Sequence, residues 1–408
     1  MFGSSPTQLL WKVQAPQAVK SFVTAINQTI MMCLGMVVIG ALVGAGGLGA
    51  ELLGTLRLRS PGRGFLVGVA VFSIAVAFDR LGRSLVDRPV TPAIRPGAYW
   101  GGVAAVLVVA LVVGRATGIS EVPWKFDSSI ATPIDDFVRW IRDHFGDTLQ
   151  VVNDFIVRDV VIRLRDLLGL TLAWPVLIAL TAAAAWLLKG WRLAASCVAG
   201  LAVVGLTGMW KPSLETLAQV LVAVVITAVL SVPLGVFVGR RPRVEAVIEP
   251  ALDALQTFPN LIYAIPFVMI FSVGYVPGIL ATVLYAIPPG VRLTALAIKQ
   301  VDPETLEASA AFGATDRQRL WGVQVPLALK GIALGVNQLI MMAMSMVIIA
   351  GLVGGGGLGY LAVTALIAHD SGLGAEVGLA MLVMAIILDR LTEGIAARLD
   401  PASAATTH

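Results

Sequence analysis

Charged residues are scarce in this chain. Asp, Glu, Lys and Arg make up 13% of its 408 residues, whereas soluble proteins carry roughly 25%. Hydrophobic residues make up 57%, and the mean hydropathy is +0.87. This composition excludes a soluble globular protein. Several apolar runs approach the ~20 residues that a helix needs to cross a bilayer, so the sequence predicts an all-α polytopic membrane protein.

The residues of several common sites are also few or missing. The two cysteines, Cys33 and Cys197, both lie in apolar runs, which excludes a disulfide framework and a zinc site built from cysteine pairs. The three histidines lie far apart, so no metal site is expected. No Gly-Lys dipeptide occurs, so the chain lacks the phosphate-binding loop of P-loop ATPases. Gly44, Gly46 and Gly49 match the dinucleotide-binding spacing, but they follow an apolar run rather than a strand. A tight turn and close helix contact explain these glycines better.

The apolar runs predict about ten membrane spans. They lie near residues 23–43, 64–79, 99–114, 171–188, 193–210, 217–238, 261–276, 278–298, 331–352 and 376–389. Basic residues near Lys189, Arg240 and Lys299 are expected to face the cytoplasm. The net charge of +4 reflects such cytoplasmic residues rather than nucleic-acid binding.

One long polar interval, residues 302–327, interrupts the apolar second half of the chain. Asp302 suits the N-cap of a short helix whose first residue is Pro303. Gly313 suits the left-handed residue that ends this helix. Thr315 and Gln318 have the spacing of a capping box, which starts a second helix. The interval therefore predicts a helix–turn–helix docking element between membrane spans.

The chain contains an internal repeat with a constant offset of 310 residues and no insertion. The matched groups are Phe2, Gly3 and Ser4 with Phe312, Gly313 and Ala314; Trp11, Val13, Gln14 and Pro16 with Trp321, Val323, Gln324 and Pro326; Asn27, Gln28, Ile30, Met31 and Met32 with Asn337, Gln338, Ile340, Met341 and Met342; Gly44, Gly46, Gly47, Leu48 and Gly49 with Gly354, Gly356, Gly357, Leu358 and Gly359; and Asp79, Arg80 and Leu81 with Asp389, Arg390 and Leu391. About half of the positions between Trp11 and Gly49 are identical, which chance does not produce. An even number of predicted crossings separates the copies, so the repeat is parallel.

The repeat predicts how the chain is divided. The expected parts are 1–85, the C-terminal part of a first copy; 86–170, a connector with one span and an amphipathic extracytoplasmic region; 171–400, a complete copy that contains the polar interval 302–327; and 401–408, a tail. Met1 aligns with Ala311, inside the polar interval of the complete copy. We therefore expect the upstream DNA to encode, in frame, the preceding part of the first copy.

Two features leave alternatives open. The amphipathic region 134–168 is either a helix that lies on the outer membrane face or an extramembrane helical hairpin packed on the spans. The amide pairs Asn27–Gln28 and Asn337–Gln338 lie inside apolar runs, where uncompensated polar groups are costly. They either line a translocation pathway or form hydrogen bonds between helices.

The polar interval also carries a family resemblance. Glu307-Ala308-Ser309, then Gly313, then Val325-Pro326 is similar to the cytoplasmic coupling signature of ABC importer permeases. In those proteins this loop docks onto the ATP-hydrolysing subunit. The resemblance implies an ABC importer-type transmembrane domain whose ATPase contacts come from Glu307, Ala308, Ser309, Gly313, Val325 and Pro326, and from Gly3 and Pro16 in the first copy.

Further runs resemble the permeases of glycine betaine/proline-type importers. They are Leu252-Asp-Ala-Leu-Gln256-Thr-Phe-Pro259, Ile287-Pro288-Pro289-Gly-Val-Arg292, the Asn-Gln-x-Ile-Met-Met run and the Gly-Gly-Leu-Gly turn. The resemblance implies import of betaine, choline-like compounds or proline across a bacterial inner (plasma) membrane. It implies an extracytoplasmic substrate-binding protein, a separate ATPase homodimer that holds ATP and Mg²⁺, and no cofactor on this chain itself. Such permeases work as two membrane domains around one pathway, so a second permease chain is a further candidate partner beside membrane lipid.

The alternative from another class is a secondary transporter driven by an ion gradient. That class typically shows inverted repeats and acidic residues at mid-membrane. This chain instead shows a parallel repeat, a polar docking element and acidic residues mostly at span ends.

Overall fold

The computed structural model describes residues 5–14, 39–58, 60–87, 131–171, 174–258 and 260–399, with isolated positions between 18 and 37 and between 104 and 115. Its elements are α1 (Pro6–Leu9), η1 (Leu10–Gln14), α3 (Leu48–Leu58), α4 (Pro61–Asp87), α6 (Ala131–Asp154), η2 (Phe155–Ile162), α7 (Arg163–Asp166), η3 (Leu167–Thr171), α8 (Trp174–Lys189), α9 (Trp191–Leu206), α10 (Trp210–Gly239), α11 (Pro242–Thr257), η4 (Asn260–Tyr263), α12 (Ala264–Phe271), α13 (Tyr275–Lys299), α14 (Pro303–Ala311), α15 (Asp316–Arg319), η5 (Leu320–Gln324), α16 (Val325–Ser345), α17 (Val347–Leu352), α18 (Gly357–Ala368) and α19 (Ser371–Arg398). All of them are helical, as the composition predicts.

The long apolar helices confirm a multi-pass membrane protein. Five helices among the described residues are long and apolar enough to cross a bilayer, or up to seven if each of two bent helix pairs counts as one span. Of the ten predicted runs, 23–43 and 99–114 lie largely outside the described residues. The run 193–210 corresponds to α9, which is shorter than a full span.

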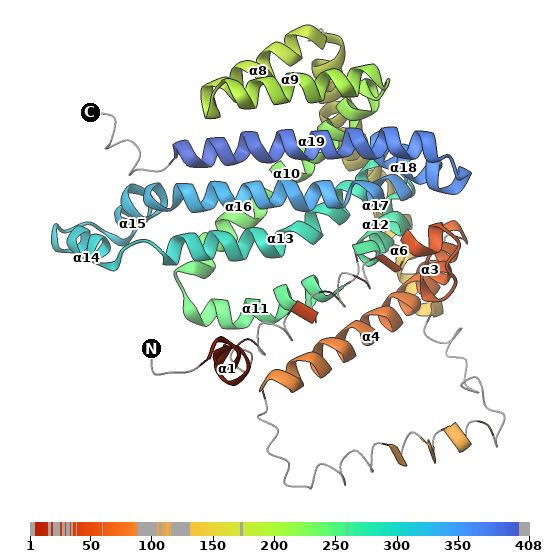
Figure 1. The fold of residues 1–408 in the computed structure, drawn as a ribbon. Helices are drawn as coiled ribbons and strands as arrows, with labels where there is room; N and C mark the ends of the chain where they lie inside the picture. The colour runs from red at the N-terminus through yellow and green to blue at the C-terminus, as the bar shows by residue number, and fades with distance from the viewer. Residues whose placement is uncertain are drawn as a thin grey trace.

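Four helices form the centre of the complete copy. α10, α13, α16 and α19 pack in that order, and α8 and α9 cover α19 (Figure 1). Val224, Ala286, Leu339 and Met384 belong to the buried cluster that they share. Lipid is as apolar as these side chains, so close packing rather than exclusion from water holds such helices together. Small residues and tight shape matching therefore decide which helices touch.

The polar interval and the amphipathic region lie at opposite ends of the bundle (Figure 1). α14 and α15 project from one end, while α6 lies near α3, α12 and α18 at the other. The amphipathic region is one continuous helical run from Ala131 to Thr171, made of α6, η2, α7 and η3. The hairpin alternative is therefore wrong: Gly146, the residue best suited to a turn within α6, stays helical. α6 packs on α4 and α12, and η2 packs on α10.

A glycine-rich turn joins α17 to α18 at the end opposite α14. Gly354, Gly356 and Gly357 all have positive φ angles, of 88°, 66° and 62°. The two helices approach so closely that a Cβ on Gly359 would lie 2.0 Å from the carbonyl oxygen of Val347. In the first copy, Gly44 and Gly47 have φ angles of 96° and 84°, and a Cβ on Gly49 would lie 2.5 Å from the carbonyl oxygen of Val37. The tight turn and close helix contact predicted for the first-copy glycines are therefore present.

The internal repeat is visible in the element bounds. Moving α15, η5, α18 and α19 back by the sequence offset of 310 places them on α1, η1, α3 and α4, with bounds that agree within one residue. α4 and α19 both run from the end near α3 and α18 toward the opposite end (Figure 1). The copies are therefore parallel, as predicted.

Candidate docking site

The polar interval 302–327, called the docking loop below, begins with a capped helix. The carboxylate of Asp302 accepts a hydrogen bond from the backbone N–H of Glu304 at 3.0 Å, and Pro303 occupies the first helical position. This cap satisfies a donor that the first turn of a helix leaves free. Both features agree with the sequence prediction.

The turn of the docking loop also agrees with the prediction. Gly313 follows α14 with φ of 83°. Thr315 then caps α15: its Oγ1 accepts from the backbone N–H of Gln318 at 3.4 Å, and the Gln318 side chain accepts from the backbone N–H of Thr315 at 2.9 Å. This reciprocal pair is the predicted capping box. The cap, the turn and the capping box thus each depend on residues only a few positions apart in the sequence.

Apolar and polar contacts attach the docking loop to the membrane helices. Leu306 and Val325 pack against a buried cluster that contains Ile298 of α13 and Ile332 of α16. The buried side chain of Gln324 donates a hydrogen bond to the carbonyl oxygen of Ile298 at 3.2 Å. The loop is thereby packed against the ends of both α13 and α16.

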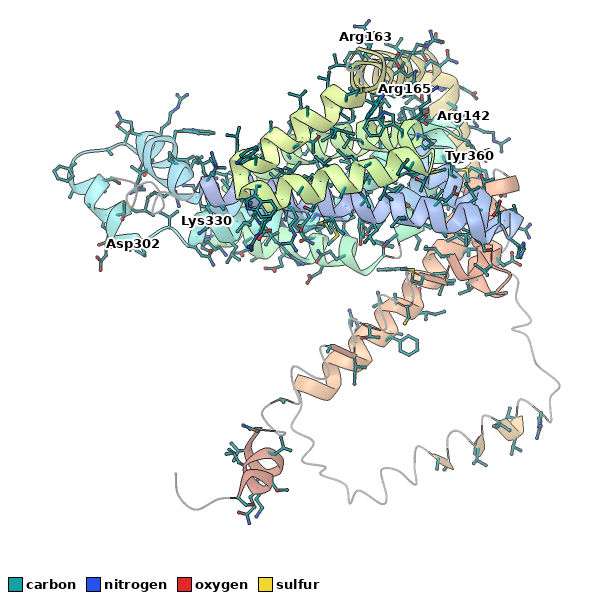
Figure 2. The ribbon with its side chains drawn as sticks, turned by 45° about the horizontal axis from the view of Figure 1, so that its top comes forward. Arg142, Arg163, Arg165, Asp302, Lys330 and Tyr360 are labelled. Carbon is teal, nitrogen blue, oxygen red and sulfur yellow. The ribbon has the colours of Figure 1, made fainter. Side chains whose placement is uncertain are left out.

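The opposite side of the loop faces solvent. Glu307, Ala308 and Pro326 are exposed, whereas Ser309 and Val325 are half-buried. Phe312 is 92% exposed. Figure 2 shows Asp302 at this end of the molecule, with Arg142 and Tyr360 at the other. An aromatic side chain so exposed on a polar loop, outside the apolar spans, is typical of a protein contact surface. Phe312 was not among the predicted contact residues, although its place directly before the turn glycine was a usable signal.

The described residues of the first copy include a counterpart of the docking-loop capping box. Gly3 and Pro16, the predicted contacts of this copy, lie outside the described residues. Between them, the Ser5 Oγ accepts from the backbone N–H of Gln8, and the Gln8 side chain accepts from the backbone N–H of Ser5, both at 3.2 Å. These residues correspond to Thr315 and Gln318 at the repeat offset. The capping box therefore occurs in both copies.

Of the predicted pathway amides, Asn337 makes contacts between helices. Its side chain donates to Asp389 Oδ1 at 3.0 Å and accepts from the Thr392 hydroxyl, so it joins α16 to α19. Gln338 is half-buried on α16, and Asn27 and Gln28 lie outside the described residues. Asn337 thus forms the hydrogen bonds of the second alternative, and a pathway role for these amides stays a prediction.

A polar cluster that the sequence did not predict lies at the far end of the bundle. The Glu215 carboxylate of α10 accepts hydrogen bonds from the Tyr275 hydroxyl of α13 and from the backbone N–H of Gly357 at 3.1 Å. The neighbouring Thr216 hydroxyl accepts from the backbone N–H of Leu358 at 2.8 Å. This Glu215 cluster therefore ties the glycine-rich turn to two central helices.

Comparisons with known proteins agree with this architecture. Residues 231–404 match the family described as binding-protein-dependent transport system inner membrane component. The chain is 39% identical over 267 residues to the glycine betaine/proline betaine transport system permease protein ProW of Escherichia coli K12, covering 64% of this chain and 75% of ProW. It is 39% identical over 269 residues to the glycine betaine transport system permease protein OpuAB of Bacillus subtilis 168, covering 65% of this chain and 94% of OpuAB.

A third relative aligns with nearly the whole chain. The trimethylamine N-oxide transport system permease protein TmoV of Ruegeria pomeroyi is 33% identical over 400 residues, which cover 95% of this chain and 60% of TmoV. These matches define the class: a multi-pass inner-membrane permease of a binding-protein-dependent ABC importer. The chain belongs to the family of binding-protein-dependent transport system inner membrane components. The alternative of an ion-driven secondary transporter is therefore wrong.

Proposed function

We propose that this permease imports a small solute with a methylated, positively charged nitrogen and a nearby anionic oxygen. The observation that supports this proposal is the agreement among relatives: ProW, OpuAB and TmoV are named for the transport of glycine betaine, proline betaine or trimethylamine N-oxide. All three solutes combine a fixed positive charge with an oxygen that carries negative charge. Tight recognition of that charge by aromatic faces belongs to the extracytoplasmic binding protein, which releases the solute to the permease.

The docking loop is the contact for the ATPase in this proposal. Glu307, Ala308 and Phe312 are exposed on its outer side, where the ATPase homodimer would bind. ATP and Mg²⁺ bind to that partner, and this chain supplies the contact and the path. Leu306 and Gln324 connect the loop to α13 and α16, so movement of the ATPase shifts the ends of helices that cross the membrane. A second permease unit completes the pathway.

Uptake by the full importer tests the substrate class. Membrane vesicles that contain the permease, its ATPase and its binding protein are supplied with labelled glycine betaine, proline betaine, trimethylamine N-oxide, choline and proline. The expected result is ATP-dependent uptake of glycine betaine, proline betaine or trimethylamine N-oxide. The unlabelled forms of the other two of these solutes should reduce that uptake by competition. Uptake restricted to proline, or to a solute without a methylated cationic nitrogen, would overturn the substrate proposal.

A further inference from the structure

α4 and α19 occupy the same position in the two copies, but different faces of the two helices are covered. In α19 the buried residues include Val377, Ala380 and Met384, which pack toward α16 and α18 of the same copy. In α4 the buried side includes Gly64 and Gly68. These glycines correspond to Gly374 and Gly378 of α19 at the repeat offset of 310. The two equivalent helices, α4 and α19, are therefore covered on different faces.

The partner of the α4 face comes from the other copy. A Cβ on Gly64 would lie 3.2 Å from Cγ2 of Ile265 in α12, and a Cβ on Gly68 would lie 3.6 Å from Cγ2 of Ile262 in η4. One helical turn further along, Phe72 stacks on Phe258 with ring centroids 4.1 Å apart. The segment 258–271 of the complete copy thus fits against the first copy's α4.

The matching face of α19 is open among the described residues. A Cβ on Gly378 would meet nothing within 4 Å, and a Cβ on Gly374 would meet only Ala365 of the same copy, at 3.8 Å. Leu382, the counterpart of Phe72, is 57% exposed. The Ala365 contact has its own counterpart, since Gly64 also touches Thr55 within its copy. Among the described residues, the contact that α19 lacks is therefore the one that α4 makes with the other copy.

We infer that the α19 face formed by Gly374, Gly378 and Leu382 binds the counterpart of segment 258–271 on another permease unit. Two units around one pathway, related by an approximate twofold axis, make each type of contact twice. The chain contains one of these contacts, between α4 and segment 258–271. The α19 face is one side of the second contact, whose other side is the counterpart of segment 258–271. This inference rests on the proposed pairing of two permease units.

Two observations select this occupant. Glycines four residues apart let a second backbone approach closely, as in helix pairs within membranes. A face that meets only lipid would gain contact area from larger apolar residues, so the glycines favour a protein partner. The segment 258–271 of this chain is already covered by its own α4. A second copy of residues 61–399 therefore does not offer this segment, and the partner is a permease unit whose corresponding segment is not already covered by an α4 helix.

Site-specific photocrosslinking in the assembled importer tests the inference. The full chain carries benzoylphenylalanine in place of Leu382, in membranes that contain the complete transporter, and mass spectrometry identifies the attached peptide. The expected product is a permease peptide that aligns with residues 258–271. The same probe at Phe72 is the positive control and should capture segment 258–271 of its own chain. Attachment at position 382 to lipid alone, to a different segment or to an unrelated protein would overturn the inference.

A matched pair of substitutions separates this contact from general damage to the helix. Val69 and Leu379 are equivalent and are 40% and 42% exposed, so this position is open in both copies. Gly378→Trp should reduce the crosslink from position 382 by more than tenfold, whereas Leu379→Trp should leave it unchanged. Equal loss in both variants would contradict the assignment. The crosslink does not depend on the solute, so an importer that forms it but takes up none of the labelled solutes would refute the substrate proposal and leave this contact standing.

Discussion

At the scale of single residues, position 313 requires glycine because of its backbone conformation and not because a side chain there would be crowded. Its φ is 83°, and a Cβ there would meet nothing within 4 Å. Gly322, also in the docking loop, has equally open surroundings but no positive φ angle. The pair therefore separates backbone strain from crowding, because only position 313 demands a left-handed conformation.

We predict that Gly313→Val disturbs the docking loop and Gly322→Val does not. A left-handed conformation costs a residue with a Cβ about 1–2 kcal/mol, and a β-branched side chain raises that cost further. Gly313→Val should insert into the membrane at a normal level, yet lose uptake and co-purification with the ATPase. Measurements of protein level, uptake and co-purification for both variants check this. Normal uptake by Gly313→Val would show that the shape of this turn is not needed for coupling.

A second residue-scale prediction concerns Phe312. Its side chain is 92% exposed, so Phe312→Ala removes little packing within the chain. An aromatic contact at the centre of an interface contributes about 2 kcal/mol or more, so ATPase binding should weaken by more than tenfold. Tyr360 is 53% exposed at the opposite end of the molecule, and Tyr360→Ala is the control. Unchanged ATPase affinity in Phe312→Ala would remove this side chain from the interface.

At the scale of elements, the Glu215 cluster holds three helices together with few groups. The carboxylate receives the Tyr275 hydroxyl and the Gly357 N–H, so removing either partner leaves a polar atom in a half-buried site. A Cβ on Gly356 would lie 2.7 Å from the Glu215 carboxylate. A side chain at position 356 would therefore collide with the Glu215 carboxylate.

We predict that Glu215→Gln and Tyr275→Phe each lower the thermal stability of the permease and that their effects are not additive. Breaking a half-buried hydrogen bond that involves a charged group costs about 1–3 kcal/mol, and residues in one network couple by about 0.5–3 kcal/mol. Thermal unfolding in detergent of both single variants and the double variant measures that coupling. Strict additivity would show that Glu215 and Tyr275 act independently.

The elements that sequence could predict are those whose determinants are local. Asp302, Gly313 and the Thr315–Gln318 box act over a few residues, and each has the predicted geometry. The bounds of α4 and α19 agree within one residue at the repeat offset of 310, because no residue is inserted or deleted between the matched groups. The Glu215 cluster could not be predicted in this way. Glu215 and Gly357 are 142 residues apart, and nothing near either residue in the sequence distinguishes it from an ordinary span-end acid or turn glycine.

At the scale of the whole molecule, the docking loop and the connector lie at opposite ends of the bundle. The positive-inside rule predicts that the docking loop faces the cytoplasm. α6 lies at the opposite end of the bundle (Figure 1). There the carboxylate of Asp135 accepts a hydrogen bond from the backbone N–H of Gly62 at 2.7 Å, which caps α4 from a separate helix. The connector is thereby attached to the first copy at the end remote from the docking loop.

This polarity predicts which residues react from which side of the membrane. Asp147 and Asp154 are exposed on α6, and Glu307 is exposed on α14. In a chain whose Cys33 and Cys197 are replaced by serine, single cysteines at positions 147 and 154 should react with an impermeant thiol reagent added outside intact cells. A cysteine at position 307 should react only after the cytoplasmic side is opened. The reverse pattern would invert the topology and place the docking loop where no ATPase can reach it. Reaction of all three positions from outside would instead show leaky membranes, which a cysteine in a cytosolic reporter protein detects. Because α6 and α14 lie at opposite ends of one helix bundle (Figure 1), agreement at these three positions orients the long helices that connect these ends.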